Sequence, residues 1–314
     1  MSAQALGSRA IIGEFFARLE QNLGASWVPL ISNLFESDQA SESYKWLGQS
    51  PVMREWLGGR DPKGFTMNGI DIANKHYEAT MEVLVDEIRR DKTGQVMIRV
   101  QEMAERTNAH WAKLLSTLII AGEATNSYDG QYFFDTDHVE GASGTNDNDI
   151  ANDITTTTAP TGGEMATGIL KATEAMLGFK DDQGEPLNEN AKEFLVMVPV
   201  PFMSAAAAAL GATVLVENST VVASNRIMAL GSLGGFVYRM AVNPRLTWTT
   251  KFAVFRTDGA VKPLIRQEEV PVSVKAIAEG SEEEFKNNRH LYGVDAWRNV
   301  GYGLYQRACL VTHT

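Results

Sequence analysis

The chain has 314 residues, with 28 basic and 39 acidic side chains and a formal net charge of −11 at pH 7. Proteins bind DNA largely because their Lys and Arg side chains displace counterions from the phosphates, so this negative charge argues against direct nucleic-acid binding as the main function. Hydrophobic residues make up 44% and charged residues 21%, which is ordinary for a folded chain and excludes disorder for most of it. The length indicates about two domains, or one domain with large excursions.

A single cysteine, Cys309, excludes an intramolecular disulfide and any multi-cysteine zinc or iron–sulfur site. It lies in an apolar strand-like run, so we expect a buried and unreactive thiol. The first residues show no charged segment followed by an apolar core, and we therefore expect no secretory signal and a soluble, cytoplasmic protein.

Residues 194–216 form an uncharged run of 23 positions, long enough to span a bilayer. However, Pro199 and Pro201 interrupt its first half, and the alanines that follow supply little transfer energy. We interpret the run as a buried strand followed by a short alanine-rich helix, with no membrane contact.

Apolar residues at helical spacing predict an amphipathic helix within residues 1–24, ending at Gly24. Residues 25–43 show no clear period and are expected to form an extended arm whose partner lies elsewhere. Residues 44–79 hold two apolar-aromatic runs around GGRDPKG, a pattern typical of a hairpin. A hairpin without a core of its own must dock on its own body or on a neighbouring subunit.

Residues 95–121 give the strongest helix signal, with a stripe formed by Val96, Val100, Met103, Trp111, Leu114 and Leu118. A helix of this length would measure about 40 Å and serve as a structural spine. Residues 127–163 are polar and are expected to form loops and short strands. A second helix follows, where Thr161 and Glu164 match a capping box and Gly178 marks the end.

The remainder is strand-rich. We predict strands over residues 236–242, 246–256, 261–267 and 270–276, and further strand within residues 290–311. Helices early in the chain and antiparallel strands late in it indicate an α+β fold.

Catalytic motifs are absent from the sequence: it has no Walker-type phosphate loop, G-x-G-x-x-G, G-x-S-x-G or H-E-x-x-H pattern. The best metal candidate is the set Asp135, Asp137 and His138, with Asp129 and Glu140 nearby. A hydrogen-bonded turn is the alternative use of these side chains, and the calcium-loop spacing is not met. We therefore expect no catalytic residue, no cofactor and no metal.

Two further groups of polar residues have a structural interpretation. The acidic residues Asp147, Asp149 and Asp153 are expected to lie in a solvated loop. The histidines at positions 76, 110, 290 and 313 are scattered and have no carboxylate near them in the sequence.

The order of elements resembles the Hong Kong 97-type fold of tailed-phage shell proteins. It consists of an N-terminal arm, a Trp/Gly-rich hairpin, a strand (EATMEVLVDEI, residues 78–88), a long helix, an inserted α/β block and returning strands. The segments YKWLGQSP, REWLGGR, NKHYEATMEVLVDEIRRD and SYDGQYFFDTDH resemble the major head subunit of Mu-like phages over nearly the whole chain.

The resemblance implies a division into an N-arm (residues 1–43), an E-loop (44–80), a peripheral domain (81–163 and 266–314, with the spine helix 95–121) and an axial domain (164–265). It also implies self-assembly into the hexamers and pentamers of an icosahedral head that encloses double-stranded DNA without sequence-specific binding. The expected location is the virion, after assembly in the bacterial cytoplasm.

The implied partners are further copies of the chain, a separate scaffold protein, a portal and a decoration protein. Interface cores favour aromatic residues, so we expect contacts between subunits at Trp46 and Trp56. The predicted contact set also includes the residues around the hairpin turn: Gly58, Gly59, Arg60 and Lys63. Some relatives cross-link a hairpin lysine, but nothing specifies an asparagine partner for Lys63.

Two alternatives stay open at this point. One is an encapsulin-like nanocompartment shell, which shares the fold and would load protein instead of DNA. The other is a metal-dependent enzyme that uses Asp135, Asp137 and His138; it predicts bound metal and a small oligomer.

Overall fold

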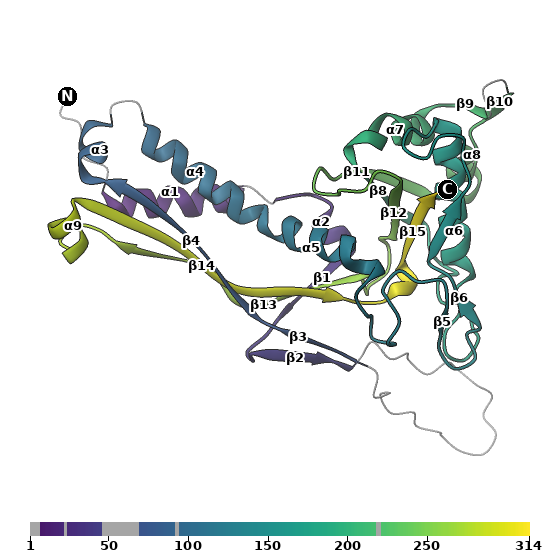
Figure 1. Ribbon diagram of the computed structural model, residues 1–314, viewed down its shortest axis with the longest axis horizontal. Helices are drawn as coiled ribbons and strands as arrows, with labels where there is room; N and C mark the ends of the chain where they lie inside the picture. Colours follow the sequence, from purple (N-terminus) through teal and green to yellow (C-terminus); the bar gives the residue numbers. More distant parts are fainter. Residues whose placement is uncertain (1–6, 22–23, 46–68, 92–93, 218–220) are drawn as a thin grey trace, which may run out of the picture.

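The computed structural model describes residues 7–21, 24–45, 69–91, 94–217 and 221–314. The molecule has an elongated part, built on a four-stranded sheet with helices along one side, and a compact lobe around a five-stranded sheet (Figure 1). The mixture of helices and sheets agrees with the predicted α+β class.

The N-terminal helix is confirmed as α1 (Ser8–Gln21), whose Ile11 and Phe15 are buried against α4 and the sheet. Gly24 follows with a φ of +71°, a left-handed conformation that favours glycine. A Cβ at this position would lie 2.9 Å from the carbonyl oxygen of Asn108, so the close approach of two backbones also requires glycine.

The segment predicted to be an extended arm finds its partner within the same chain. It forms α2 (Val28–Ile31), β1 (Ser32–Glu36) and β2 (Ser41–Tyr44). Strand β1 pairs in parallel with β13, from Ser32 opposite Leu264 to Glu36 opposite Glu268. Its backbone groups are therefore satisfied by a strand near the other end of the sequence.

The sheet of the elongated part has the order β1-β13-β14-β4. Strands β4 (Lys75–Leu84), β13 (Leu264–Ile277) and β14 (Arg289–Tyr302) are antiparallel neighbours. The two strands predicted over residues 261–267 and 270–276 are thus one strand with shifts of register between Glu268 and Ser273. Pro271 lies within this irregular stretch. It is beyond the end of β1, so β13 is an edge strand there and the backbone N–H that proline lacks is not needed for pairing.

The strand predicted over residues 78–88 is too long. It ends at Leu84, and α3 (Val85–Arg90) follows. This short helix has acidic residues in its first turn and arginines in its last turn, an arrangement that favours the helix dipole.

The spine helix predicted over residues 95–121 is also interrupted. It consists of α4 (Gln95–Asn108) and α5 (His110–Ile120), separated at Ala109. The Asn108 side chain donates a hydrogen bond to the carbonyl of Leu19 at 2.9 Å, which ties this joint to the end of α1. The predicted stripe holds in α4 but shifts in α5, where the buried residues are Ala112, Leu115, Ser116 and Ile119.

The compact lobe contains α6 (Gly162–Gly178), whose predicted capping box is confirmed. The backbone N–H of Glu164 donates to Thr161 Oγ1 at 3.3 Å, and the N–H of Thr161 donates to Glu164 Oε2 at 2.8 Å. Two orphan N–H groups at the start of the helix are thereby satisfied.

The sheet of the lobe has the order β11-β8-β12-β15-β7. Strand β8 (Glu193–Val198) places Leu195 and Met197 on one face and Phe194, Val196 and Val198 on the other, and both faces are buried in separate apolar clusters. Because both faces of β8 are buried, its residues 194–198 are all apolar instead of alternating with polar residues. The remaining strands are β7 (Asp149–Asn152), β11 (Val237–Val242), β12 (Lys251–Arg256) and β15 (Ala308–His313).

The strand predicted over residues 246–256 is therefore confirmed only from Lys251. Beyond β8 lie α7 (Met203–Gly211), the pair β9 (Val214–Glu217) and β10 (Val221–Ser224), and α8 (Arg226–Gly234). Of the helices in the described ranges, none has both the length and the apolar character needed to cross a bilayer.

Residues 127–163 form loops with the short strands β5 (His138–Val139), β6 (Thr145–Asn146) and β7. The solvated loop predicted for the acidic residues is wrong at Asp149, which opens β7 and pairs in parallel with β15 opposite Leu310. Burial is the main cause that raises the pKa of Asp149 above its usual value.

Candidate assembly surfaces

Strands β2 and β3 (Ile70–Ala73) form an antiparallel pair that ends at Tyr44 opposite Ile70. This is the expected base of a hairpin. The six residues predicted to contact other subunits all lie in residues 46–68, outside the described residues: Trp46, Trp56, Gly58, Gly59, Arg60 and Lys63. Their contacts stay a prediction.

The base of this hairpin is fixed to the main sheet by a fully buried glutamine. Gln267 accepts a hydrogen bond from the Tyr44 hydroxyl at 2.7 Å and donates to the Ile72 carbonyl at 3.1 Å and to Asn74 Oδ1 at 2.8 Å. Because buried polar groups are costly when unpaired, this network holds β2 and β3 in a defined place on β13.

The far end of the elongated part carries α9 (Glu282–Asn287), in the turn between β13 and β14 (Figure 1). No residue of this six-residue helix is buried, and the Phe285 side chain is 91% exposed. At the other end of the molecule, Leu233 of α8 is 88% exposed, and Met203, Val214 and Met228 nearby in the lobe are also exposed. Large apolar side chains left in water at both ends are typical of surfaces that a partner covers.

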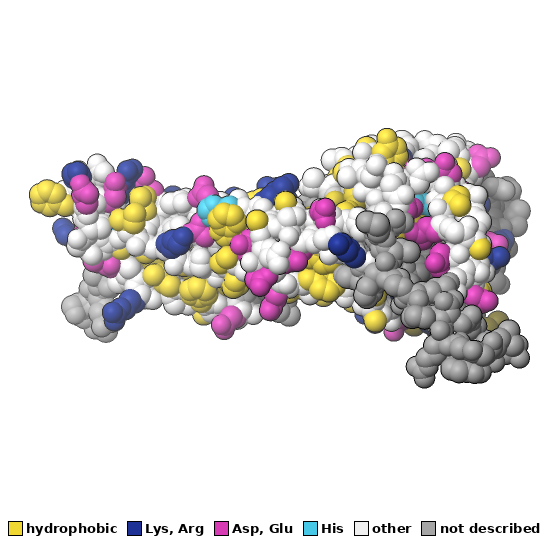
Figure 2. Space-filling view, turned by 90° about the horizontal axis from the view of Figure 1, so that it is seen from below, with side chains coloured by type: hydrophobic (Ala, Val, Ile, Leu, Met, Phe, Trp, Pro, Cys, Tyr) yellow, Lys and Arg dark blue, Asp and Glu magenta, His cyan; other side chains and the backbone are white. Residues whose placement is uncertain are grey.

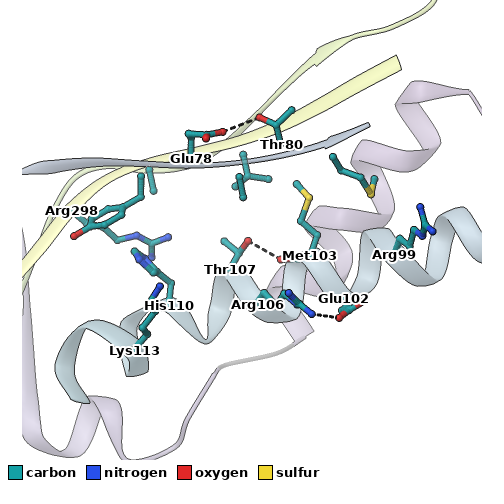
Figure 3. Close-up of a pocket in the computed structure, with 15 residues that line it drawn as sticks. Glu78, Thr80, Arg99, Glu102, Met103, Arg106, Thr107, His110, Lys113 and Arg298 are labelled. Atoms are coloured by element: carbon teal, nitrogen blue, oxygen red, sulfur yellow. Dashed lines mark hydrogen bonds and ion pairs between the residues drawn. The ribbon is translucent and has the colours of Figure 1, made fainter. Parts of the chain in front are cut away.

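A groove of about 540 Å³ separates α4 and α5 from β4 and β14 (Figure 3). Apolar side chains line its middle, and cations and two carboxylates line its edges. Figure 3 shows Arg298 and His110 close together at one end of the groove and Arg99 toward the other end. Seen from below, hydrophobic, acidic and basic side chains alternate along the elongated part, without a continuous basic surface on that face (Figure 2).

The proposed metal ligands do not form a common site. Asp135 accepts hydrogen bonds from the N–H groups of Tyr132 and Thr136, and Asp137 accepts one from Gln131 Nε2 at 3.1 Å. His138 instead pairs with Asp129, at 2.6 Å between Nδ1 and Oδ2. Across the described ranges, no three His, Cys, Asp or Glu side chains are grouped to hold an ion. Asp135, Asp137 and His138 are therefore held by separate hydrogen bonds, and the alternative of a hydrogen-bonded turn is confirmed.

His138 is fully buried and stacks on the Tyr305 ring, with centroids 3.6 Å apart. The pair joins the loop after the spine helix to the end of the chain. Gln306 extends this link, because its Nε2 donates to the Tyr128 hydroxyl at 2.8 Å.

Two other histidines have carboxylate partners, one distant in the sequence and one only six residues away, so the expectation that none lies near them is wrong for His290. His76 Nε2 lies 2.8 Å from Asp295 Oδ1 and the His76 ring stacks on Trp297, both across the β4–β14 pairing. His290 Nε2 lies 3.4 Å from Glu284 Oε1 of α9. The first pairing is visible only once the register of the sheet is known.

The Cys309 side chain is fully buried in the lobe, as predicted. Burial raises the pKa of its thiol well above the usual value, and nearby Asp147 and Asp149 add to the effect. The thiolate that reacts or binds metal is therefore disfavoured.

Comparison with solved structures defines the fold. The chain is similar to a subunit in the procapsid of bacteriophage JBD30, with a TM-score of 0.55 and 23% identity, over 100% of this chain and 77% of that chain. It is also similar to the mature capsid of bacteriophage PhiM1, with a TM-score of 0.54 and 12% identity, over 93% of this chain and 88% of that one. The fold is thus the Hong Kong 97-type phage capsid fold, as the sequence predicted.

The sequence then specifies the family. The model of the Mu-like prophage major head subunit gpT matches residues 12–161 and 240–314, and the chain belongs to this family. It is 36% identical over 124 residues to the Mu-like prophage FluMu major head subunit of Haemophilus influenzae, covering 39% of this chain and 40% of that protein. It is 33% identical over 108 residues to the major capsid protein of Escherichia phage Mu, covering 34% of this chain and 35% of that protein. The aligned stretches thus span less than half the length of these relatives.

Proposed function

We propose that the chain is a structural subunit, without catalytic activity, that self-assembles into the hexamers and pentamers of an icosahedral phage head enclosing double-stranded DNA. Membership of the Mu-like major head subunit family is the observation that carries this proposal. The surface supports it: Phe285 and Leu233, at opposite ends of the molecule, are 91% and 88% exposed. An isolated subunit leaves both in water, whereas a lattice of subunits can cover both.

In this proposal the compact lobe acts as the axial domain around the five-fold and six-fold positions, and the elongated part acts as the peripheral domain. Residues 164–265 supply β8, β11 and β12 of the lobe sheet, while β7 and β15 come from the segments assigned to the peripheral domain. We include both strands in the axial domain, because β15 pairs with β12 over five positions. Residues 1–43 and 44–80 keep their proposed roles as N-arm and E-loop.

The proposed partners are further copies, a separate scaffold protein, a portal and a decoration protein, with assembly in the bacterial cytoplasm before incorporation into the virion. The net charge of −11 agrees with a wall that does not bind the DNA it encloses.

The test is the size of the assembled product. The full chain, expressed with its scaffold, is analysed by sedimentation velocity and negative-stain electron microscopy, and we expect closed shells of megadalton mass. Leu233→Asp should prevent closure, because a charge replaces an exposed apolar contact, whereas Thr158→Asp on an exposed loop should not. A monomer or dimer that stays small with scaffold present would refute the proposal. Shells that enclose a protein cargo in infected cells would favour a nanocompartment instead.

A further inference from the structure

The groove between the spine helices and the sheet has an apolar middle. Met81 of β4, Met103 of α4, and Val294 and Ala296 of β14 line it, within a volume of about 540 Å³. This space is larger than a phenylalanine side chain needs, and methionines adapt readily to an inserted ring.

The edges of the groove carry more positive than negative charge. Its cations are Arg99, Arg106, Lys113 and Arg298, and its carboxylates are Glu78 and Glu102. Burial lowers the pKa of His110 to about 4, with Arg298, Lys113 and Arg245 adding to the effect, so this histidine is neutral near pH 7. The groove is therefore a local positive site in a chain of net charge −11.

Of the four cations that line the groove, Arg298 is the buried one. The residue is 3% exposed, and its Nε has no hydrogen-bond partner among the described residues. Its guanidinium carbon lies 4.9 Å from the centroid of the Trp111 ring, a contact that supplies no hydrogen-bond acceptor. A buried donor without a partner is costly, and an acceptor arriving from outside would remove this cost.

The complementary surface is the end of the β13–β14 hairpin. There Phe285 is 91% exposed and Ile277 is 49% exposed. Around them lie four carboxylates, Glu279, Glu282, Glu283 and Glu284, against two cations, Lys286 and Arg289. The segment thus combines a protruding apolar side chain with an excess of negative charge, and it is complementary to the groove in both shape and charge.

A chain cannot place its own Phe285 in its own groove. Strand β14 starts at Arg289 and lines the groove only from Val294 to Arg298. At roughly 3.3 Å per residue, this rigid strand keeps the helix about 17 Å or more from the groove. A Phe285 side chain that enters the groove must therefore belong to a second copy.

We propose that α9 of one copy docks in the groove of a second copy, with Phe285 against Met81 and Met103 and the acidic residues of α9 facing Arg99, Arg106 and Lys113. This inference rests on the proposed function, because it names one contact of the subunit lattice. The contact joins two different surfaces, so repeating it forms a ring or an extended array rather than an isolated pair. The aromatic anchor supplies binding energy and the charges fix the orientation.

Cysteine cross-linking tests the contact. Asn287→Cys, at an exposed position of α9 that leaves Phe285 in place, is combined with Thr107→Cys, whose position lines the groove on α4. The matched control combines Asn287→Cys with Ile98→Cys, a position on the same helix as Thr107 that is 61% exposed and outside the groove lining. The native Cys309 is buried and does not interfere. Under mild oxidation, we expect the first pair to form intermolecular disulfides at least about tenfold faster than the control, because docking raises the effective concentration of the thiols.

Charge exchange provides a second measurement. Arg106→Glu with Lys113→Glu should slow the cross-linking at least about tenfold, since like charges then face each other. Adding Glu282→Lys and Glu283→Lys should restore it. A purely structural effect of the groove substitutions would not be reversed by substitutions on a different surface.

The outcomes separate the inference from the proposed function. Shells that form while the 287–98 pair cross-links as fast as the 287–107 pair would overturn the docking contact and leave the shell role intact. A fast 287–107 cross-link in a chain that never closes into shells would support the contact and refute the shell role. If the chain forms no shells and shows no selective cross-link, both the docking contact and the shell role are refuted.

Discussion

The pair formed by Asp129 and His138 should contribute more to stability than any other polar contact of its loop. Asp129 Oδ2 lies 2.6 Å from His138 Nδ1, and the two side chains are 3% and 0% exposed. His138 Nε2 has no hydrogen-bond partner among the described residues. Asp129→Ala would therefore leave the imidazole buried with neither nitrogen paired.

The magnitude follows from the cost of an unpaired buried group. Losing a hydrogen bond to a carboxylate and leaving its donor buried should lower the free energy of unfolding by about 2 to 3 kcal/mol. Asp129→Asn keeps an acceptor oxygen and should cost less, about 1 kcal/mol. Asp137→Ala is the matched control: Asp137 is exposed, so its loss should stay within about 0.5 kcal/mol.

Urea unfolding of the unassembled subunit, followed by tryptophan fluorescence, measures these differences as shifts of midpoint at constant slope. Equal midpoints for Asp129→Ala and Asp137→Ala would refute the reasoning. So would a stabilisation by added zinc that appears in the unsubstituted chain and disappears in Asp129→Ala, since the pair would then be part of a metal site.

Three further predictions concern the lobe. Thr161→Ala removes the cap of α6 and should lower the free energy of unfolding by about 1 kcal/mol, whereas Thr158→Ala, on an exposed turn, should leave the urea midpoint unchanged. Burial alone would raise the pKa of Glu164, but hydrogen bonds from Thr161 and Thr155 outweigh it and lower the pKa below its usual value of 4.5. A carboxyl whose pKa is lowered by folding stabilises the folded state above its unfolded-state pKa, and this contribution is lost as the pH falls through its folded-state pKa. In Glu164→Gln this contribution is absent, so the free energy of unfolding should fall less between about pH 6 and about pH 3 than in the unsubstituted chain. The Cys309 thiol should not react with a thiol reagent at about pH 8 until the chain is unfolded in urea, and rapid reaction of the native protein would contradict its burial.

Local patterns in the sequence predicted several elements because short-range physics decides them. The capping box at Thr161 and Glu164 needs only two side chains three residues apart, and the structure contains it. The uncharged run beginning at Phe194 was correctly interpreted as a buried strand and a short helix, since two prolines exclude a continuous apolar helix. The distinctive segment at residues 127–138 indicated the family, and it lies within the matched range.

Other features could not be read from local patterns because they depend on residues distant in the sequence. The break of the spine at Ala109 coincides with the Asn108 hydrogen bond to α1. Asp149 was expected in solvent, but pairing with β15 partly buries it. His76 and Asp295 are brought together only by the register of β4 and β14.

The sequence by itself thus determined the α+β class and the cap of α6, because periodicity and capping act over a few residues, and it indicated the family through the resemblance of its local segments. Only the tertiary structure decided the groove and its relation to α9. The groove side chains come from β4, α4, α5 and β14, and no sequence spacing records that these four elements meet. The exposure of Phe285 is likewise a tertiary property, because a phenylalanine in a short acidic helix is equally compatible with a core position until the fold shows that nothing covers it.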